Sequence, residues 1–222
     1  MKLALTQLKP LSVSGSRPIL ITDADEVILH FADILSEYLL TQGMYVNFIS
    51  YALEGNIKYL DSHKPVQSAR FKSIISDYFE NYVEKQPLVD GARDHLKNLS
   101  AQCDIIILTN IPHDFADRRR QQLVDYGLNY PMISSSGPKG PVMKHIRQMT
   151  EQKIIFIDDI SHHHKSVAQT VPEALRIQYI ANGHLNSIEK KSKYCHHRCR
   201  NWAHIEQVIK KHLDEKIDHE PE

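Results

Sequence analysis

Acidic residues occur in pairs directly after two short apolar segments of the chain. Asp23 and Asp25 follow the run ILIT, and Asp158 and Asp159 follow the run IIFI. Two carboxylates this close can take different roles, one ionised as a nucleophile or metal ligand and the other holding or relaying a proton. If both pairs meet, their charges repel unless a hard divalent cation neutralises them, and oxygen ligands favour magnesium. The pattern predicts a magnesium site beside a catalytic pair of aspartates.

Two other segments carry groups that could bind an anion. Thr109 ends the apolar run IIILT and offers a hydroxyl beside the backbone N–H groups of the next residues, which begin with Asn110. Lys139 lies in the loop SSSGPKGP ahead of a helical pattern, and Lys144 on that helix is the alternative. Phosphoryl transfer needs a nucleophile, an acid for the leaving group, a cation and donors for the phosphoryl oxygens. The residues therefore predict phosphoryl-transfer chemistry.

These residues need elements that bring them to one edge. The runs at 19–22, 105–109 and 154–157 are short, continuous and rich in β-branched residues, which is typical of parallel strands buried on both faces. Helical patterns separate the runs, at residues 91–100, 114–126 and 141–150. Alternating strands and helices predict an α/β fold, a parallel sheet flanked by helices, and ligands bind such sheets at the carboxyl ends of the strands.

About eighty residues separate the first run from the second, and this interval contains helical patterns of its own. Residues 31–40 and 66–83 repeat apolar side chains at helical spacing. We predict a small α-helical cap domain at residues 33–86, and a core domain formed by residues 1–32 and 87–222. The last ten residues are predicted to be a frayed end.

The three runs with their polar ends, together with the loop that carries Lys139, resemble the haloacid dehalogenase (HAD) superfamily, in its phosphatase branch. The motifs appear in order as ILITDADEV, IIILTN, GPKGP and IIFIDD, and the resemblance spans residues 17 to about 180. It implies a Rossmann-like core with a type-1 helical cap that supplies substrate specificity. It also implies that Asp23 attacks phosphorus to form an aspartyl-phosphate, while Asp25 protonates the leaving oxygen and then activates water.

The resemblance assigns the remaining site residues as well. Thr109 and Lys139 would hold the phosphoryl group, with Asn110 beside them as a phosphate-binding candidate that is more often structural. Magnesium would be bound by Asp23, by the backbone carbonyl of Asp25, and by Asp158 and Asp159. The implied substrate is a small phosphorylated metabolite.

One departure from the family pattern leaves other functions open. Glu26 stands where the family has a small residue, and its charge near an anion site allows a HAD-like binding or regulatory protein with little turnover. A phosphonatase would need a cap lysine, for which Lys58, Lys64 and Lys72 are candidates. A dehalogenase is disfavoured because its chemistry has no use for Asp25.

Composition argues against other classes of partner. Lys and Arg equal Asp and Glu at 27 each, which gives no electrostatic case for nucleic acid or membrane binding. We find no signal peptide and no run that could span a bilayer, and three cysteines do not make a disulfide framework, so we expect a cytoplasmic protein. Neither the substrate's identity nor the oligomeric state follows from the sequence.

Several other polar clusters have two interpretations each. His113 is a candidate for touching substrate, whereas residues 162–164 (HHH) are better explained as a polar loop leading into a helix than as metal or phosphate contacts. Residues 118–120 (RRR) are predicted to be a solvated helix face. The segment YCHHRCRNWAH has cysteines and histidines that suit zinc, but an isolated cluster is more often surface; its candidate ligands are Cys195, His196, His197, Cys199 and His204.

Overall fold

The computed structural model describes residues 6–7 and 15–215, and its centre is a parallel sheet of six strands in the order β5-β4-β1-β6-β7-β8. β1 lies between β4 and β6, and Thr22 at its end is level with Ile107 and Ile157. The carboxyl ends of these three strands therefore meet at one edge. The strands are β1 (Ile19–Thr22), β4 (Asp104–Thr109), β5 (Met132–Ser134), β6 (Ile154–Asp158), β7 (Leu175–Gln178) and β8 (His197–Arg198).

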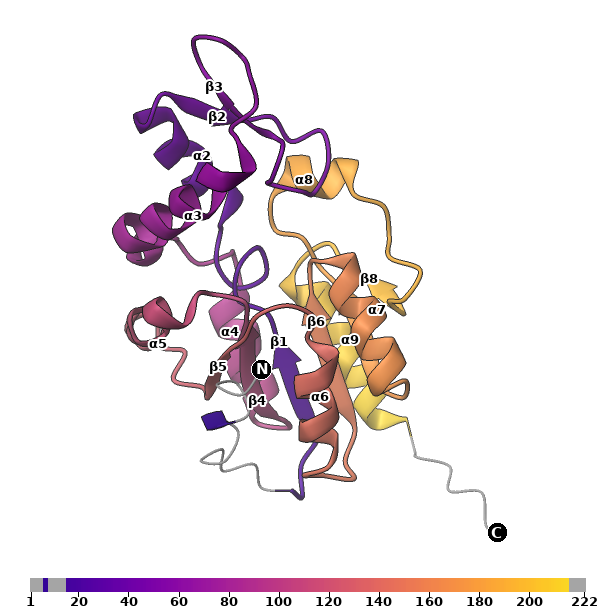
Figure 1. Cartoon of the computed structure of the whole chain (residues 1–222). Helices are drawn as coiled ribbons and strands as arrows, with labels where there is room; N and C mark the ends of the chain where they lie inside the picture. Colours follow the sequence, from indigo (N-terminus) through magenta and orange to yellow (C-terminus); the bar gives the residue numbers. More distant parts are fainter. Residues whose placement is uncertain (1–5, 8–14, 216–222) are drawn as a thin grey trace.

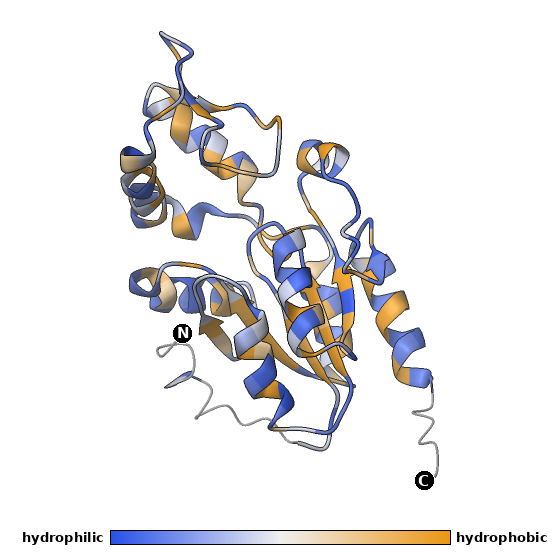
Figure 2. Cartoon of the chain, turned by 45° about the vertical axis from the view of Figure 1, so that its right-hand side comes forward, coloured by the Kyte–Doolittle hydropathy of each residue, from blue (hydrophilic) through white to orange (hydrophobic). Residues whose placement is uncertain are grey.

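Helices cover both faces of the sheet because successive strand residues point to opposite faces. Leu20, for example, packs in the core cluster that includes α4 and α9, whereas Ile19 packs in the cluster that includes α6 and α7. Figure 2 shows the apolar strands between these helices. The helices of this part are α4 (Ala92–Ser100), α5 (Ala116–Asp125), α6 (Gly140–Arg147), α7 (Ser161–Thr170), α8 (Gly183–Ile188) and α9 (Trp202–Asp214), with a short η2 (His113–Phe115) before α5.

Residues 32–85, between β1 and α4, form a layer beyond the carboxyl edge of the sheet (Figure 1). Aromatic rings hold its helices together: Tyr38 makes edge contacts with Tyr78 and Tyr82 at centroid distances of 5.7 and 5.1 Å. Residues of α3 therefore form much of the interior of this layer. Its elements are α2 (Ala32–Thr41), β2 (Met44–Val46), β3 (Ile57–Tyr59), α3 (Ser68–Tyr82) and η1 (Val83–Lys85).

The predicted α/β fold class is confirmed, and the three predicted strands lie within one residue of those observed. The predicted cap region contains helices, and it also contains an antiparallel pair, β2 and β3, that was not predicted. Three-residue strands carry too short a pattern to be distinguished in sequence. The prediction that the last ten residues form a frayed end is wrong for the first two of them, because α9 extends to Asp214. Residues 216–222 lie outside the described residues. The division into cap and core domains stays a prediction.

Within the described ranges, every helix is too short or too polar to cross a membrane.

Candidate active site

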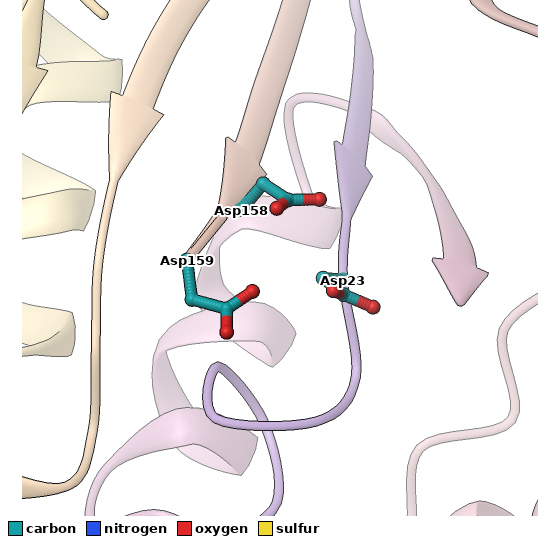
Figure 3. A group of neighbouring side chains, drawn as sticks. All are labelled: Asp23, Asp158 and Asp159. Carbon is teal, nitrogen blue, oxygen red and sulfur yellow. The ribbon is translucent and has the colours of Figure 1, made fainter. Parts of the chain in front are cut away.

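Three buried carboxylates meet at the carboxyl edge of the sheet. Asp23 follows β1, Asp158 is the last residue of β6, and Asp159 comes directly after it. One oxygen from each lies within 4.8 Å of the others (Figure 3). The parallel register of β1 and β6 places them there, as the paired motifs predicted.

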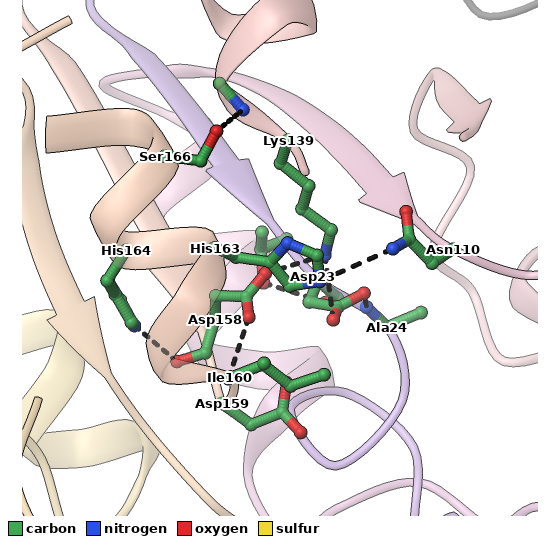
Figure 4. A network of polar contacts seen from close by, with 12 residues as sticks. Asp23, Ala24, Asn110, Lys139, Asp158, Asp159, Ile160, His163, His164 and Ser166 are labelled. Carbon is green, nitrogen blue, oxygen red and sulfur yellow. Dashed lines mark hydrogen bonds and ion pairs between the residues drawn. The ribbon is translucent and has the colours of Figure 1, made fainter. Parts of the chain in front are cut away.

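Lys139 lies between two of these carboxylates. Its Nζ is 2.8 Å from Asp23 Oδ2 and 2.7 Å from Asp158 Oδ2, and its side chain is fully buried (Figure 4). Burial alone would lower the pKa of Lys139, but the two carboxylates raise it above its ordinary value. Lys139 is therefore a fixed positive charge beside Asp23, whereas the alternative, Lys144, is exposed.

The position of Lys139 depends on the close approach of two helices. Gly140 begins α6 directly after Lys139, and a Cβ added there would lie 2.4 Å from the backbone oxygen of Ser166 in α7. The Gly140 N–H donates to Ser166 Oγ at 3.1 Å, and Thr170 Oγ1 donates to the Gly140 carbonyl at the same distance. Glycine at this position thus allows α6 to start against α7.

The cluster carries more negative charge than Lys139 can neutralise. Burial raises the pKa of Asp23 to about 7, although Lys139 opposes this shift. Burial, and then the charges of Asp158 and Asp23, raise the pKa of Asp159 well above its usual range. Asp159 Oδ1 is also buried with no hydrogen-bond partner in the described part of the chain. An unpartnered oxygen within an all-carboxylate donor set fits a hard divalent cation such as magnesium.

Asp25 lines the same cavity, but its side chain has other partners. Its Oδ1 accepts a hydrogen bond of 2.8 Å from Gln86 Nε2 and lies 3.1 Å from Arg119 Nη2. Its side chain is therefore not among the three clustered carboxylates, and a metal contact from Asp25 would use its backbone carbonyl. A carboxylate held apart from the metal ligands is suited to proton transfer.

Arg119 corrects the prediction that residues 118–120 form a solvated helix face. Its guanidinium is 0% exposed, contacts Asp25, and also donates to Gln86 Oε1. Arg118 follows the prediction, since it is partly exposed and pairs with Glu84. The two arginines differ in exposure because α5 directs the side chain of residue 119 toward the interior. Three consecutive arginines in a sequence do not indicate which of them is buried.

Thr109 and Asn110, both predicted to contact phosphate, line the same cavity but differ in their partners. Thr109 Oγ1 is buried and has no partner among the described residues. Asn110 Nδ2 donates to the Gly137 carbonyl at 3.0 Å and lies 3.4 Å from His163 Nε2. Thr109 therefore has a hydroxyl available for a ligand, whereas the Asn110 side chain connects the loop after β4 to the loop that carries Lys139.

The carboxylate of Glu26 is occupied by backbone donors. Oε1 accepts from the N–H groups of Phe31 and Ala32 at 2.9 and 2.6 Å, and Oε2 accepts from Asn182 at 2.8 Å. Burial raises the pKa of Glu26, and the three backbone hydrogen bonds oppose that shift. The backbone of Glu26 adopts φ 59°, a left-handed conformation that suits small residues. Glu26 thus fixes the start of α2 to the segment before α8.

Five of these residues lie in the floor of a cavity of about 430 Å³, namely Asp23, Asp25, Thr109, Asn110 and Asp159. Its roof comes from the layer above the sheet, including residues 48 and 51–54 and two phenylalanines of α3. The Tyr51 hydroxyl donates to Asp159 Oδ2, so the roof contacts the carboxylate cluster directly. Tyr51 lies in an irregular segment, and no sequence signal distinguished it.

The histidine candidates contact other groups of the protein, and His163 also lines the cavity. His113 Nδ1 is 2.7 Å from Ser134 Oγ in β5 and does not line this cavity. His163 and His164 are buried in α7, and burial lowers the pKa of His163 to about 3, so this ring is neutral. His164 Nε2 is 3.0 Å from the Asp158 carbonyl. Among the described residues, the three aspartates are the one group close enough together to hold a metal. In the segment at 194–204, Cys195 and Cys199 are buried, whereas His196 and His197 are exposed.

Comparison with solved structures identifies the fold. No known family model and no curated protein matches the chain. A haloacid dehalogenase-like protein of unknown function from Agrobacterium tumefaciens aligns over 90% of this chain and 100% of its own, with a TM-score of 0.63 and 14% identity. A predicted phosphoglycolate phosphatase from Haemophilus somnus aligns over 86% and 97%, with a TM-score of 0.61 and 14% identity. A HAD-family hydrolase from Deinococcus radiodurans with bound phosphate and sodium aligns over 89% and 96%, with a TM-score of 0.58 and 12% identity. The chain has the HAD-like fold.

Proposed function

We propose that this chain is a magnesium-dependent phosphatase that hydrolyses a phosphate monoester through an aspartyl-phosphate on Asp23. The observation that carries this proposal is the buried Lys139, which pairs with Asp23 and Asp158 at the end of the cavity where Thr109 has a free hydroxyl. The HAD-like fold shared with phosphatases and hydrolases adds support.

Asp23 is held in a defined orientation by both of its oxygens. Oδ1 accepts from the Ala24 N–H at 2.7 Å, and Oδ2 pairs with Lys139. In the first step, an Asp23 oxygen bonds to phosphorus as the bond from phosphorus to the leaving oxygen breaks. Asp25 gives its proton to that oxygen, which departs as an alcohol. Thr109 Oγ1 is available to donate to a phosphoryl oxygen.

The second step reverses the role of Asp25. Asp25 takes a proton from water as the water oxygen attacks phosphorus, and the bond from Asp23 breaks to release inorganic phosphate. Magnesium held by Asp23, Asp158 and Asp159 would neutralise charge on the phosphoryl group. The roof over the cavity would exclude bulk water, which strengthens these electrostatic interactions.

The residues that suggested the two alternative functions do not support them. A binding protein with little turnover was suggested by Glu26, whose carboxylate already accepts three backbone hydrogen bonds. A phosphonatase would need a lysine facing the cavity, and Lys58, Lys64 and Lys72 are absent from the described residues that line it. The substrate we propose is a small phosphorylated metabolite.

The test is turnover with covalent trapping. Purified protein with magnesium should release phosphate from an aryl phosphate, and Asp23→Asn should reduce turnover to the background rate. Rapid quench followed by mass spectrometry should place a phosphoryl adduct on the peptide containing Asp23. An adduct on a histidine, or wild-type turnover in Asp23→Asn, would overturn the proposal.

A further inference from the structure

The cavity has an uneven distribution of charge. Among the described residues that line it, the ionisable side chains are the acids Asp23, Asp25, Asp159, Glu26 and Glu54 together with the neutral His163 and Tyr51. The lining includes no lysine or arginine of the described chain. Lys139 lies beneath the floor and is already paired with two carboxylates. The metal site and Lys139 would offset the charge of a ligand's phosphoryl group, but a second anionic group would find no positively charged side chain in the described lining.

The wall away from the carboxylates is apolar and largely aromatic. It contains Phe31 at the start of α2, Phe48 and Leu53 from the loop between β2 and β3, and Phe71 and Phe79 from α3. Phe79 is held in place by stacking on Phe115, with the ring centroids 5.9 Å apart. Such a wall has few donors or acceptors for the hydroxyl groups of a sugar, and burying those groups without partners is unfavourable.

We infer that the leaving group of the substrate is apolar or aromatic and carries no negative charge of its own. This inference rests on the proposed phosphatase function and specifies its substrate class. It separates this chain from enzymes whose substrates carry a carboxylate or a second phosphate beside the scissile one, since that group would lie unpaired in an apolar, acidic cavity. Glu54, exposed at the cavity's rim, adds to the repulsion of such a group.

Binding of two matched phosphonates tests the inference without requiring turnover. Benzylphosphonate and phosphonoacetate both place one methylene on phosphorus, and they differ in carrying a phenyl ring or a carboxylate. Calorimetry on the wild-type protein with magnesium should give benzylphosphonate an affinity higher by roughly 10- to 100-fold, because the ring buries apolar area and the carboxylate finds no counter-charge. Equal affinities, or tighter binding of phosphonoacetate, would overturn the inference.

Two variants with a matched control identify the surface responsible. Phe71→Ala should reduce the advantage of benzylphosphonate by about tenfold, whereas Ile49→Ala should leave it unchanged, because Ile49 is 72% exposed on the same layer and does not line the cavity. Glu54→Lys should tighten phosphonoacetate selectively. An unchanged preference in both Phe71→Ala and Glu54→Lys would contradict the inference.

Kinetics separate a failure of this inference from a failure of the proposed function. The kcat/KM for 4-methylphenyl phosphate should exceed that for 4-carboxyphenyl phosphate by about tenfold or more. Selective binding of benzylphosphonate without turnover of any ester would contradict the phosphatase proposal and leave the ligand class supported. Turnover of both esters at equal kcat/KM would support the phosphatase and contradict the ligand class.

Discussion

Asp23 and Asp25 are two residues apart, yet the chain holds them with different partners. Asp23 pairs with Lys139 inside the carboxylate cluster, whereas Asp25 contacts Gln86 and Arg119 on the other side of the loop. In a straight extended segment these two positions would share a face, but the chain bends at Ala24, between them. The separation allows one carboxylate to act as nucleophile while the other transfers protons.

This division predicts different outcomes for the two amide variants. Asp23→Asn cannot form the acyl phosphate and should fall to background. Asp25→Asn keeps the nucleophile and the metal ligands but loses the proton donor and base, a role worth about 10²–10⁴-fold. With an aryl phosphate, whose leaving group needs little protonation, the first step should survive better than the second.

The measurement for Asp25→Asn is intact-protein mass spectrometry after rapid quench. A phosphorylated enzyme should accumulate in this variant and not in Asp23→Asn. An adduct absent from Asp25→Asn while turnover stays at the wild-type rate would show that another group transfers the proton.

Arg119 is predicted to position Asp25 without touching the substrate. Arg119→Met removes the buried guanidinium and leaves Gln86 as the remaining partner of the Asp25 side chain. The kcat for a substrate with a poor leaving group should fall by about tenfold or more, whereas KM and the magnesium response should change little. With an activated aryl phosphate the loss should be smaller.

Arg118→Met is the control for this variant. Arg118 is on the same helix but is partly exposed, and its pair with Glu84 is a surface ion pair worth about 0–1 kcal/mol. Activity near the wild-type level is expected. Equal losses in the two variants, for both kinds of leaving group, would show that α5 acts through stability alone.

At the residue scale, site residues that follow strands could be predicted from the sequence, whereas two that come from a helix and an irregular loop could not. Asp23, Asp158 and Thr109 could be predicted because each ends an apolar run. Arg119 and Tyr51 could not, because the inward turn of α5 and the path of an irregular loop depend on long-range packing.

Among the elements, the loop after β1 is anchored to distant parts of the chain through Glu26. Glu26 accepts hydrogen bonds from the start of α2 and from Asn182, and its own carbonyl accepts from Ala181 at 2.9 Å. A carboxylate at a helix N-terminus also interacts favourably with the helix dipole. The acidic side chain that seemed unfavourable for an anion site therefore stabilises the loop that carries Asp23 and Asp25, the two aspartates proposed to be catalytic.

Glu26→Gln should destabilise the protein. The glutamine has one acceptor oxygen, and its amide would face a backbone N–H donor where the glutamate has a second oxygen. One buried donor left without an acceptor costs about 1–3 kcal/mol. Urea unfolding should show a lower midpoint with an unchanged m-value.

Glu37→Gln, on the exposed side of α2, is the matched control and should unfold at the wild-type midpoint. If Glu26→Gln also unfolds there, the three hydrogen bonds do not stabilise the loop. Lower activity in Glu26→Gln without lower stability would instead indicate an electrostatic effect on the site.

At the element scale, the strands predicted from sequence were those that contain a continuous apolar run of at least three residues. β5, β7 and β8 were not predicted, nor was the β2–β3 pair. β8 has two residues, and β7 interrupts its apolar pattern with Arg176 and Gln178. These short segments are strands because they pair with neighbouring strands, and a local sequence pattern does not reveal that pairing.

At the scale of the whole molecule, distant segments converge on the loop after β1. Trp202 of α9 is fully buried and donates from Nε1 to the Val27 carbonyl at 3.0 Å. The His30 N–H donates to the Pro87 carbonyl at 2.9 Å, where the chain returns from the layer above the sheet. The stability of the fold and the geometry of the site are therefore coupled, and a ligand that binds the site should stabilise the entire protein.

Magnesium should raise the melting temperature of the wild-type protein. The three clustered carboxylates repel one another in the folded state, and a cation that binds them only there stabilises it by about 2.7 kcal/mol at one hundred times its Kd. For a chain of this length that corresponds to a rise of about 5–10 °C. Differential scanning calorimetry in chelator and in millimolar magnesium is the measurement.

Three variants determine whether this rise comes from the carboxylate cluster. Asp159→Asn should lose most of it, because the amide supplies a neutral ligand in place of a charged one. Asp61→Asn, an exposed aspartate of the layer above the sheet, should keep all of it. Tyr51→Phe removes the hydroxyl that hydrogen-bonds Asp159 Oδ2 and frees that oxygen, so its rise should equal or exceed the wild-type value. The same rise in Asp159→Asn as in the wild type would place the bound magnesium elsewhere, whereas its loss in Tyr51→Phe would make the tyrosine part of the metal site.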